Sequence, residues 1–255
     1  MPWNWKGASL SKWNGRALKP ELLECAGPAH ADRNLRELAR INRWFGGHRD
    51  LLRAMRDLVH PRERFSVLDV GAGSGDMGRC LTRHFPKVKV VSIDHRLLHL
   101  RKAPSPRVAA DALQLPFAKH AFDFVLCSSV LHHFPDCGVV ETISTLRQYA
   151  RRALLLLGLE RRPFAYHFLP LTRKILGWGP LTVHDGPISV AAGFRLEELV
   201  SLARAGGSDV AFARRHRPWF RVSVAVPACP PEFAGRKTAP VADESYPMLV
   251  SSAGD

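Results

Sequence analysis

Apolar residues recur every three or four positions in two segments near the start of the chain. This spacing predicts one helix over residues 32–45, ended by Gly46-Gly47, and a second helix over residues 48–59. Residues 1–20 carry no such period. We therefore expect residues 1–60 to form an N-terminal cap that is irregular at first and then helical.

From residue 65 the pattern changes to short apolar runs that alternate with helical stretches. The expected strands cover residues 65–70, 88–93, 107–109, 122–127, 153–157, 209–215 and 219–226, and the expected helices cover residues 76–85, 95–102, 138–150 and 195–205. Strands that alternate with helices form a parallel sheet with helices on both faces. The pattern therefore predicts a doubly wound α/β core over residues 61–226.

Two segments depart from this alternation. Residues 160–187 form an apolar and aromatic insert, for which we predict a helical lid over a substrate. Burial of the insert against the sheet and shallow contact with a membrane stay open as alternatives. The tail, residues 227–255, is rich in Pro, Ala and Ser, and we expect it to be loose.

The composition is that of a globular domain. The 255 residues are 46% hydrophobic and 24% charged, and no apolar stretch reaches the roughly 18 residues that a membrane span needs. The five cysteines are odd in number and contain no CxxC pair. We therefore expect a cytoplasmic protein with neither a disulfide framework nor a metal site.

The charge balance is strongly basic. The chain has 37 Lys and Arg against 23 Asp and Glu, a formal net charge of +14, which attracts nucleic acid, anionic lipid or acidic small molecules. However, 28 of the 37 bases are Arg, and they are scattered without a run of five. This distribution favours a general composition bias and disfavours nucleic acid as a partner.

The sharpest chemical signal follows the first predicted strand, where Asp69-Val70 leads into the run Gly71-Ala72-Gly73-Ser74-Gly75. Three alternating glycines leave the backbone bare for close contact with a ligand, and the helix that follows offers free N–H groups. The loop therefore predicts a nucleotide-type cofactor. Gly73 to Gly78 also fits the dinucleotide pattern Gly-x-Gly-x-x-Gly, so an NAD-dependent oxidoreductase is an alternative at this point.

Polar residues stand at the ends of the next three strands, at the edge where doubly wound sheets bind ligands. Asp94 ends the second strand, next to His95, and can accept both hydroxyls of a ribose. Asp111-Ala112 follows the third strand, within reach of an adenine. Ser128 ends the fourth strand, shortly before His132-His133.

Taken together, these motifs resemble the class I S-adenosylmethionine-dependent methyltransferases. The resemblance covers residues 21–226 and implies a Rossmann-like, doubly wound, seven-stranded and mostly parallel sheet with an antiparallel last strand. The helix and hairpin predicted at residues 195–226 fit that ending. Segments at Ile41–His48 and His184–Ser189 are similar to a bacterial branch that methylates aromatic, polyketide or quinone-type small molecules.

The resemblance implies S-adenosylmethionine as the cofactor. The glycines would line its methionine part, Asp69 would meet its ammonium, and Asp94 would hold its ribose. Ser128 or Ser129 would border the transfer site, and Arg43 or Arg49 either meets the cofactor carboxylate or belongs to a solvated helix face. The expected cofactor-binding set is Asp69, Gly71, Ala72, Gly73, Gly75, Asp94, His95, Asp111, Ala112 and Ser128.

Methyl transfer needs alignment of the acceptor and, for a hydroxyl acceptor, removal of a proton. His133 and His132 are the candidate bases, because histidine titrates near neutrality and both follow the fourth strand; alternatively, one of them only packs or caps the next element. Related enzymes place an acid after the fifth strand, where this chain has Gly158. Either Glu160 substitutes, or the histidine acts alone, or methylation is poor.

His184-Asp185 is a second polar group, which either returns over the active site or builds a turn with Gly186-Pro187.

We predict a methyltransferase of secondary metabolism that acts on a hydroxyl or carbon of an apolar aromatic, polyketide or quinone-like small molecule. An RNA or DNA methyltransferase and a catalytically weak cofactor-binding protein are the alternatives. The run Cys127-Ser128-Ser129 departs from the Asn/Asp-Pro-Pro-aromatic run of amino-methylating nucleic-acid enzymes.

Overall fold

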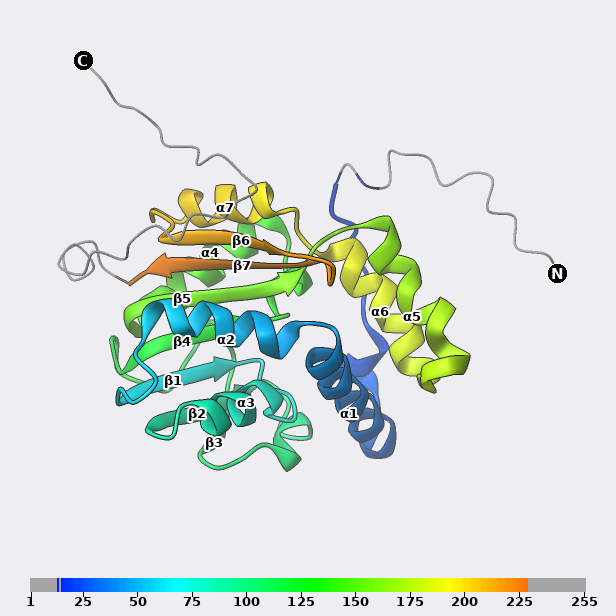
Figure 1. Cartoon of the computed structure of the whole chain (residues 1–255), viewed down its shortest axis with the longest axis horizontal. Helices are drawn as coiled ribbons and strands as arrows, with labels where there is room; N and C mark the ends of the chain where they lie inside the picture. The colour runs from blue at the N-terminus through cyan, green and yellow to red at the C-terminus, as the bar shows by residue number, and fades with distance from the viewer. Residues whose placement is uncertain (1–12, 14, 229–255) are drawn as a thin grey trace, which may run out of the picture.

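The computed structural model describes residue 13 and residues 15–228, and a seven-stranded sheet lies at its centre (Figure 1). The strands are β1 (Phe65–Val70), β2 (Val88–Asp94), β3 (Arg107–Ala109), β4 (Phe122–Ser128), β5 (Ala150–Leu159), β6 (Phe212–His216) and β7 (Arg221–Pro227). Their order is β3-β2-β1-β4-β5-β7-β6. The first five strands pair in parallel, whereas β7 is antiparallel to both β5 and β6, so the predicted fold is confirmed.

Helices surround this sheet. They are α1 (Pro28–Trp44), α2 (Gly47–Leu58), α3 (Asp76–His84), α4 (Asp136–Arg147), α5 (Pro163–Leu176), α6 (Pro180–Ala192) and α7 (Leu196–Ala205), with short 3₁₀ turns at Leu22–Cys25, His99–Lys102 and Leu131–His133. Figure 1 shows α1, α5 and α6 together at the end of the sheet to which β1 and β5 point. None of the described helices is long and apolar enough to cross a membrane.

Two apolar cores cover the two faces of the sheet. Side chains alternate along β1, so Val67 packs with one core and Leu68 with the other. The core around Val67 includes Met55 of α2 and Leu81 of α3. Burial on both faces explains why the central strands are continuous apolar runs.

Several boundaries differ from the predicted ones. The helix predicted over residues 95–102 is only a 3₁₀ turn at its end, and the insert forms two helices that continue to Ala192. β5 begins at Ala150, where it pairs with Phe122 of β4, and not at residue 153. The sequence pattern missed this start because Arg151-Arg152 interrupt the apolar run; the Arg152 guanidinium packs over the Phe124 ring and donates to the Leu58 carbonyl. The predicted loose tail lies outside the described residues, apart from its first two positions.

Candidate functional site

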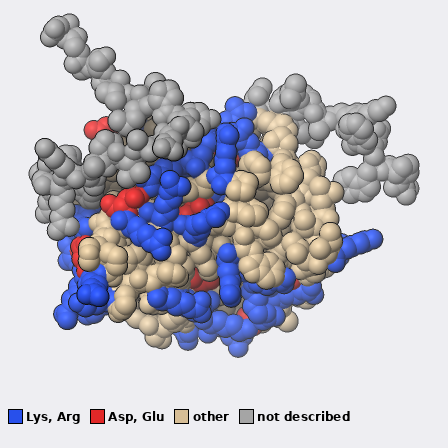
Figure 2. Space-filling view, viewed as in Figure 1, with Lys and Arg blue, Asp and Glu red and all other residues tan. Residues whose placement is uncertain are grey.

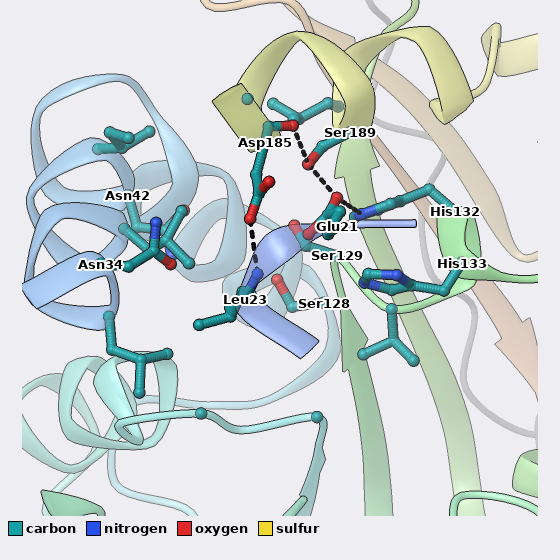
Figure 3. A pocket seen from close by; sticks show the side chains of 18 of the residues that line it. Glu21, Leu23, Asn34, Asn42, Ser128, Ser129, His132, His133, Asp185 and Ser189 are labelled. Carbon is teal, nitrogen blue, oxygen red and sulfur yellow. Dashed lines mark hydrogen bonds and ion pairs between the residues drawn. The ribbon is translucent and has the colours of Figure 1, made fainter. Parts of the chain in front are cut away.

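A cavity of about 1110 Å³ opens at the carboxyl ends of β1, β2 and β4, under α1, α5 and α6 (Figure 3). Ligand pockets in proteins typically measure roughly 300–1,000 Å³, so this cavity has room for a cofactor and a second ligand. It is lined by nine of the ten predicted cofactor-binding residues, namely Asp69, Gly71, Ala72, Gly73, Asp94, His95, Asp111, Ala112 and Ser128. The candidate bases His132 and His133 line it as well.

The glycine loop needs its glycines for two different reasons. Gly71 has a φ of +67°, and a Cβ there would lie 2.1 Å from Cγ2 of Val130, so only glycine fits. Gly73 also has a positive φ and lines the cavity. Gly75 does not line it: this residue is the N-cap before α3, in the left-handed conformation, and a Cβ there would meet Pro104. Its contribution is to the turn.

Asp94 is held in a fixed orientation at the cavity wall. Its Oδ2 accepts the Gly73 N–H at 3.1 Å, and its Oδ1 accepts the Arg96 N–H at 3.0 Å. The Nδ1 atom of His99 lies 3.3 Å from Oδ1. Burial opposes ionisation of Asp94, but these hydrogen bonds outweigh it and lower its pKa. The cavity therefore presents a rigid carboxylate at the end of β2.

Three buried polar atoms of residues that line the cavity have no hydrogen-bond partner within the described chain: Asn34 Oδ1, Asp69 Oδ2 and His99 Nε2. Burial raises the pKa of Asp69 to about 8, with Asp76 and Asp94 adding to the shift. Buried polar groups are almost always satisfied in native proteins. Unpartnered atoms around one cavity fit a polar ligand that would supply the missing partners.

Glu21, His132 and His133 meet on the opposite wall (Figure 3). Glu21 Oε1 lies 3.3 Å from Nε2 of His132 and accepts the Ser189 hydroxyl at 2.5 Å. The two imidazole rings lie 4.3 Å apart between centroids. His132 is buried, whereas His133 keeps contact with the space of the cavity. The site thus pairs a buried carboxylate–imidazole couple with a second imidazole that opens to a ligand.

The charges of this group are set by its surroundings. Burial acts to raise the pKa of Glu21, but the hydrogen bond and charge of His132, with His133 and Ser189, lower it overall. Enclosure by the cavity walls and the neighbouring His132 lower the pKa of His133. At neutral pH the group therefore holds an ionised Glu21 and a neutral His133 with a free lone pair.

The segment before α1 carries Glu21 into the cavity. The Asp185 carboxylate accepts the backbone N–H groups of Leu22 and Leu23, each at 2.9 Å, and Arg16 donates to the Phe134 carbonyl at 2.7 Å. Asp185 therefore returns to the cavity, whereas His184 does not line it. The alternative of an Asp-Gly-Pro turn is wrong, because these residues lie inside α6. Asp185 acts on the backbone of this segment.

Two alternatives from the sequence are corrected. Glu160 does not partner a histidine of the cavity: it is buried and paired with Arg162 and Arg215, and it does not line the cavity. Arg43 and Arg49 are exposed and do not line it either, which fits a solvated helix face.

The sequence did not point to Glu21, because 111 positions separate it from His132 and no motif surrounds it.

A metal site was not expected, and one group could form one. The ligand atoms of Glu21, His132 and His133 lie within 4.8 Å of one another, as a metal site would require. Hydrogen bonds from His132 and Ser189 already satisfy Glu21, so the arrangement is explained by the protein's own contacts. The expected absence of a metal stays a prediction.

The strand order, the glycine loop at the end of β1 and the carboxylate at the end of β2 define a nucleotide-binding α/β enzyme class. Comparison with known proteins identifies it further. The sequence profile of a family described as "Methyltransferase domain" matches residues 68–152. A solved S-adenosylmethionine-dependent methyltransferase from Aquifex aeolicus superposes with a TM-score of 0.57 at 16% identity, covering 80% of this chain and 100% of that one.

Curated relatives of this chain are also methyltransferases. The chain is 31% identical over 173 residues to a demethylmenaquinone methyltransferase of Roseiflexus sp., covering 61% of this chain and 73% of the relative. A protein of the same name from Porphyromonas gingivalis is 28% identical, with 62% and 73% covered. The chain belongs to the class I S-adenosylmethionine-dependent methyltransferases. It is a methyltransferase enzyme, and S-adenosylmethionine is its cofactor.

Proposed function

We propose that this enzyme methylates a hydroxyl or carbon of an apolar, aromatic, quinone-like small molecule. The observation that carries the proposal is the composition of the cavity lining, which combines polar groups at the ends of β1, β2 and β4 with aromatic side chains of α5 and the β6–β7 turn. The Glu21–His132–His133 group lines the same cavity (Figure 3). The similarity to demethylmenaquinone methyltransferases over almost three quarters of their length supports a quinone-type acceptor. We place the reaction in the cytoplasm and in secondary metabolism.

The polar wall has the groups that the cofactor needs. Gly71 and Gly73 would contact its methionine part, and the unpartnered oxygen of Asp69 would accept its ammonium. The carboxylate of Asp94, with His95 beside it, would accept the ribose hydroxyls, and Asp111-Ala112 would lie along the adenine. The bound cofactor supplies a sulfonium that carries an electrophilic methyl group.

Another part of the lining is apolar. It contains Phe164, Phe168 and Leu169 of α5 together with Trp219 and Phe220 of the β6–β7 turn. Among the described residues that line the cavity, the Lys and Arg side chains are limited to Lys19 and Arg221. Such a surface favours a flat apolar acceptor and offers little to a polyanion. The high net charge therefore lies mainly outside the site.

His133 is the proposed base. Its lowered pKa leaves a lone pair at neutral pH, and its ring opens to the cavity beside the end of β4. The nearby negative charge of Glu21 stabilises the imidazolium that forms when His133 takes a hydroxyl proton from the acceptor. Glu21, bonded to His132, thus takes the place of the acid that related enzymes carry where this chain has Gly158.

A methyl-transfer panel tests the proposal. The full chain is incubated with labelled S-adenosylmethionine and reduced demethylated naphthoquinones, simple phenols, malonyl-acyl carrier protein and bulk RNA. We expect transfer to the naphthoquinols, and a loss of about 10²–10⁴-fold in His133→Ala with unchanged cofactor affinity by calorimetry. Transfer to RNA or to the acyl carrier protein alone would overturn the acceptor class, and full activity in His133→Ala would overturn the base.

A further inference from the structure

Exposed apolar side chains are concentrated at one end of the molecule. Eight large ones are exposed in the described chain, and one of them, Leu97, is on the turn after β2. The other seven belong to the segment before α1, to α1 and to α5: Leu18, Leu22, Leu38, Trp44, Phe164, Leu171 and Ile175. Single exposed apolar residues are normal, but a gathering at one end marks an interaction surface.

Helix α5 carries the most exposed part of this surface. The helix has 14 residues and none of them is buried, although its sequence is mostly apolar. Phe164, Leu171 and Ile175 are 63%, 76% and 84% exposed. Their spacing of seven and four positions places them on one face of the helix. The helix therefore presents an apolar stripe to its surroundings.

The charge around this stripe has one sign. No Asp or Glu stands between Glu160 and Asp185 in the sequence. Arg173 and Lys174 of α5 are exposed and make no ion pair with a described residue. Figure 2 shows uncharged residues over α5 and α6, with Lys and Arg along the margins of this area.

The two bases just before α5, Arg161 and Arg162, are engaged with the rest of the chain. Arg161 is buried and paired with Glu198, and Arg162 pairs with Glu160. Arg173 and Lys174 are therefore the α5 cations that remain available to a partner.

The end of α1 extends the surface. Trp44 is 46% exposed, and the Arg40 guanidinium lies over both the Trp44 and Trp178 rings. Arg40 also donates to the Leu176 carbonyl, which joins α1 to the end of α5. Tryptophan and arginine side chains side by side suit the headgroup region of a bilayer, because each has an apolar body and a polar part.

We propose that α5 and the end of α1 rest on an anionic membrane surface. The apolar stripe would enter the boundary between headgroups and acyl chains, while Arg173, Lys174 and Arg40 would meet anionic headgroups. Phe164 belongs both to the stripe and to the wall of the cavity. If the proposed function holds, an apolar acceptor can therefore pass from the lipid into the cavity along α5.

Vesicle sedimentation of the full chain tests this surface without cofactor or acceptor. We expect binding to vesicles of phosphatidylcholine mixed with phosphatidylglycerol, weaker binding to phosphatidylcholine alone, and a decrease with added salt. Leu171→Ser/Ile175→Ser should lower the partition coefficient about tenfold or more. Arg173→Glu/Lys174→Glu should lower the preference for phosphatidylglycerol. Leu97→Ser and Lys119→Glu are the matched controls and should bind as the unmodified chain does.

Three results would overturn the proposal: no binding to either vesicle, equal binding by the α5 variants, or an equal loss in the controls. Sedimentation velocity without lipid tests whether a second copy of the chain covers this surface instead. A dimer that Leu171→Ser/Ile175→Ser converts to a monomer would assign the surface to that second copy. None of the α5 residues substituted here lines the cavity. Turnover of the variants on a detergent-dispersed acceptor thus reports separately on the proposed function.

Discussion

Replacing Glu21 by Gln removes a negative charge from the proposed catalytic group, Glu21–His132–His133, and keeps the shape of the side chain. Glu21 lies 3.3 Å from His132 and accepts a hydrogen bond from Ser189, so the amide can keep part of both contacts. Hydrogen bonds to charged groups contribute about 1.5–3 kcal/mol. If that stabilisation acts on the imidazolium formed in the transition state, kcat should fall about 10–100-fold.

The pH profile separates a catalytic effect from a structural one. Glu21 acts to raise the pKa of His133, which burial and His132 lower. The base works in its neutral form, so kcat rises with pH through the pKa of His133. Without the charge of Glu21 that pKa is lower still, and the acid limb of the profile should move to lower pH.

The assay is steady-state methyl transfer to the acceptor that the panel identifies, from pH 5 to pH 9, with cofactor affinity measured by calorimetry. Glu141→Gln is the matched control, because this carboxylate is exposed on α4 outside the cavity. A Glu21→Gln enzyme with the control's kcat and pH profile would refute the reasoning. A loss confined to cofactor affinity would refute it as well, since it would make Glu21 a binding residue.

Gly71→Ala should weaken binding of S-adenosylhomocysteine and lower the free energy of unfolding by more than about 1–2 kcal/mol. The added Cβ would lie 2.1 Å from Val130 Cγ2, so a second substitution, Val130→Ala, should restore part of both the affinity and the stability. An unchanged melting temperature and affinity in Gly71→Ala would contradict this. Asp94→Asn should lower cofactor affinity about tenfold or more by calorimetry, through loss of a charged acceptor, whereas Arg43→Ala, on the exposed face of α1, should leave it unchanged. The pKa of Asp69 is raised to about 8 in the folded protein, from an ordinary 3.8. Between about pH 3.8 and about pH 8 the folded chain therefore binds one more proton than the unfolded chain, and the free energy of unfolding falls as pH rises through this range. Asp69→Asn should therefore stabilise the unliganded protein by up to about 4 kcal/mol at pH 7 in urea unfolding, with little gain at pH 4, and should weaken cofactor binding; equal stability at both pH values would count against it. Dialysis against EDTA should leave turnover unchanged, and a loss that Zn²⁺ or Mn²⁺ restores would assign the Glu21–His132–His133 group to a metal instead.

Sequence alone was sufficient for the fold and for most of the polar wall of the cavity. Apolar runs identified the central strands because burial on both faces of the sheet requires them, whereas the edge strands β3 and β6 are largely exposed or half-buried and gave weaker patterns. The glycine loop identified the cofactor end of β1 because its backbone conformation excludes other residues. Asp94 and Ser128 followed from their places at strand ends, since those ends meet at one edge of a parallel sheet. Such signals lie within short stretches of sequence, so they can be found without the structure.

Only the tertiary structure assembled the Glu21–His132–His133 group. Glu21 reaches His132 across 111 positions because other parts of the chain hold the segment that carries it. Asp185 on α6 accepts the Leu22 and Leu23 N–H groups, and Arg96 donates to the Leu23 carbonyl. Gly75 has the loop's glycine pattern but faces away from the cavity, and Glu160 has the expected position in sequence but pairs with Arg215. A side chain's partners depend on which segments pack together, and that packing is a property of the whole chain, which no local pattern encodes.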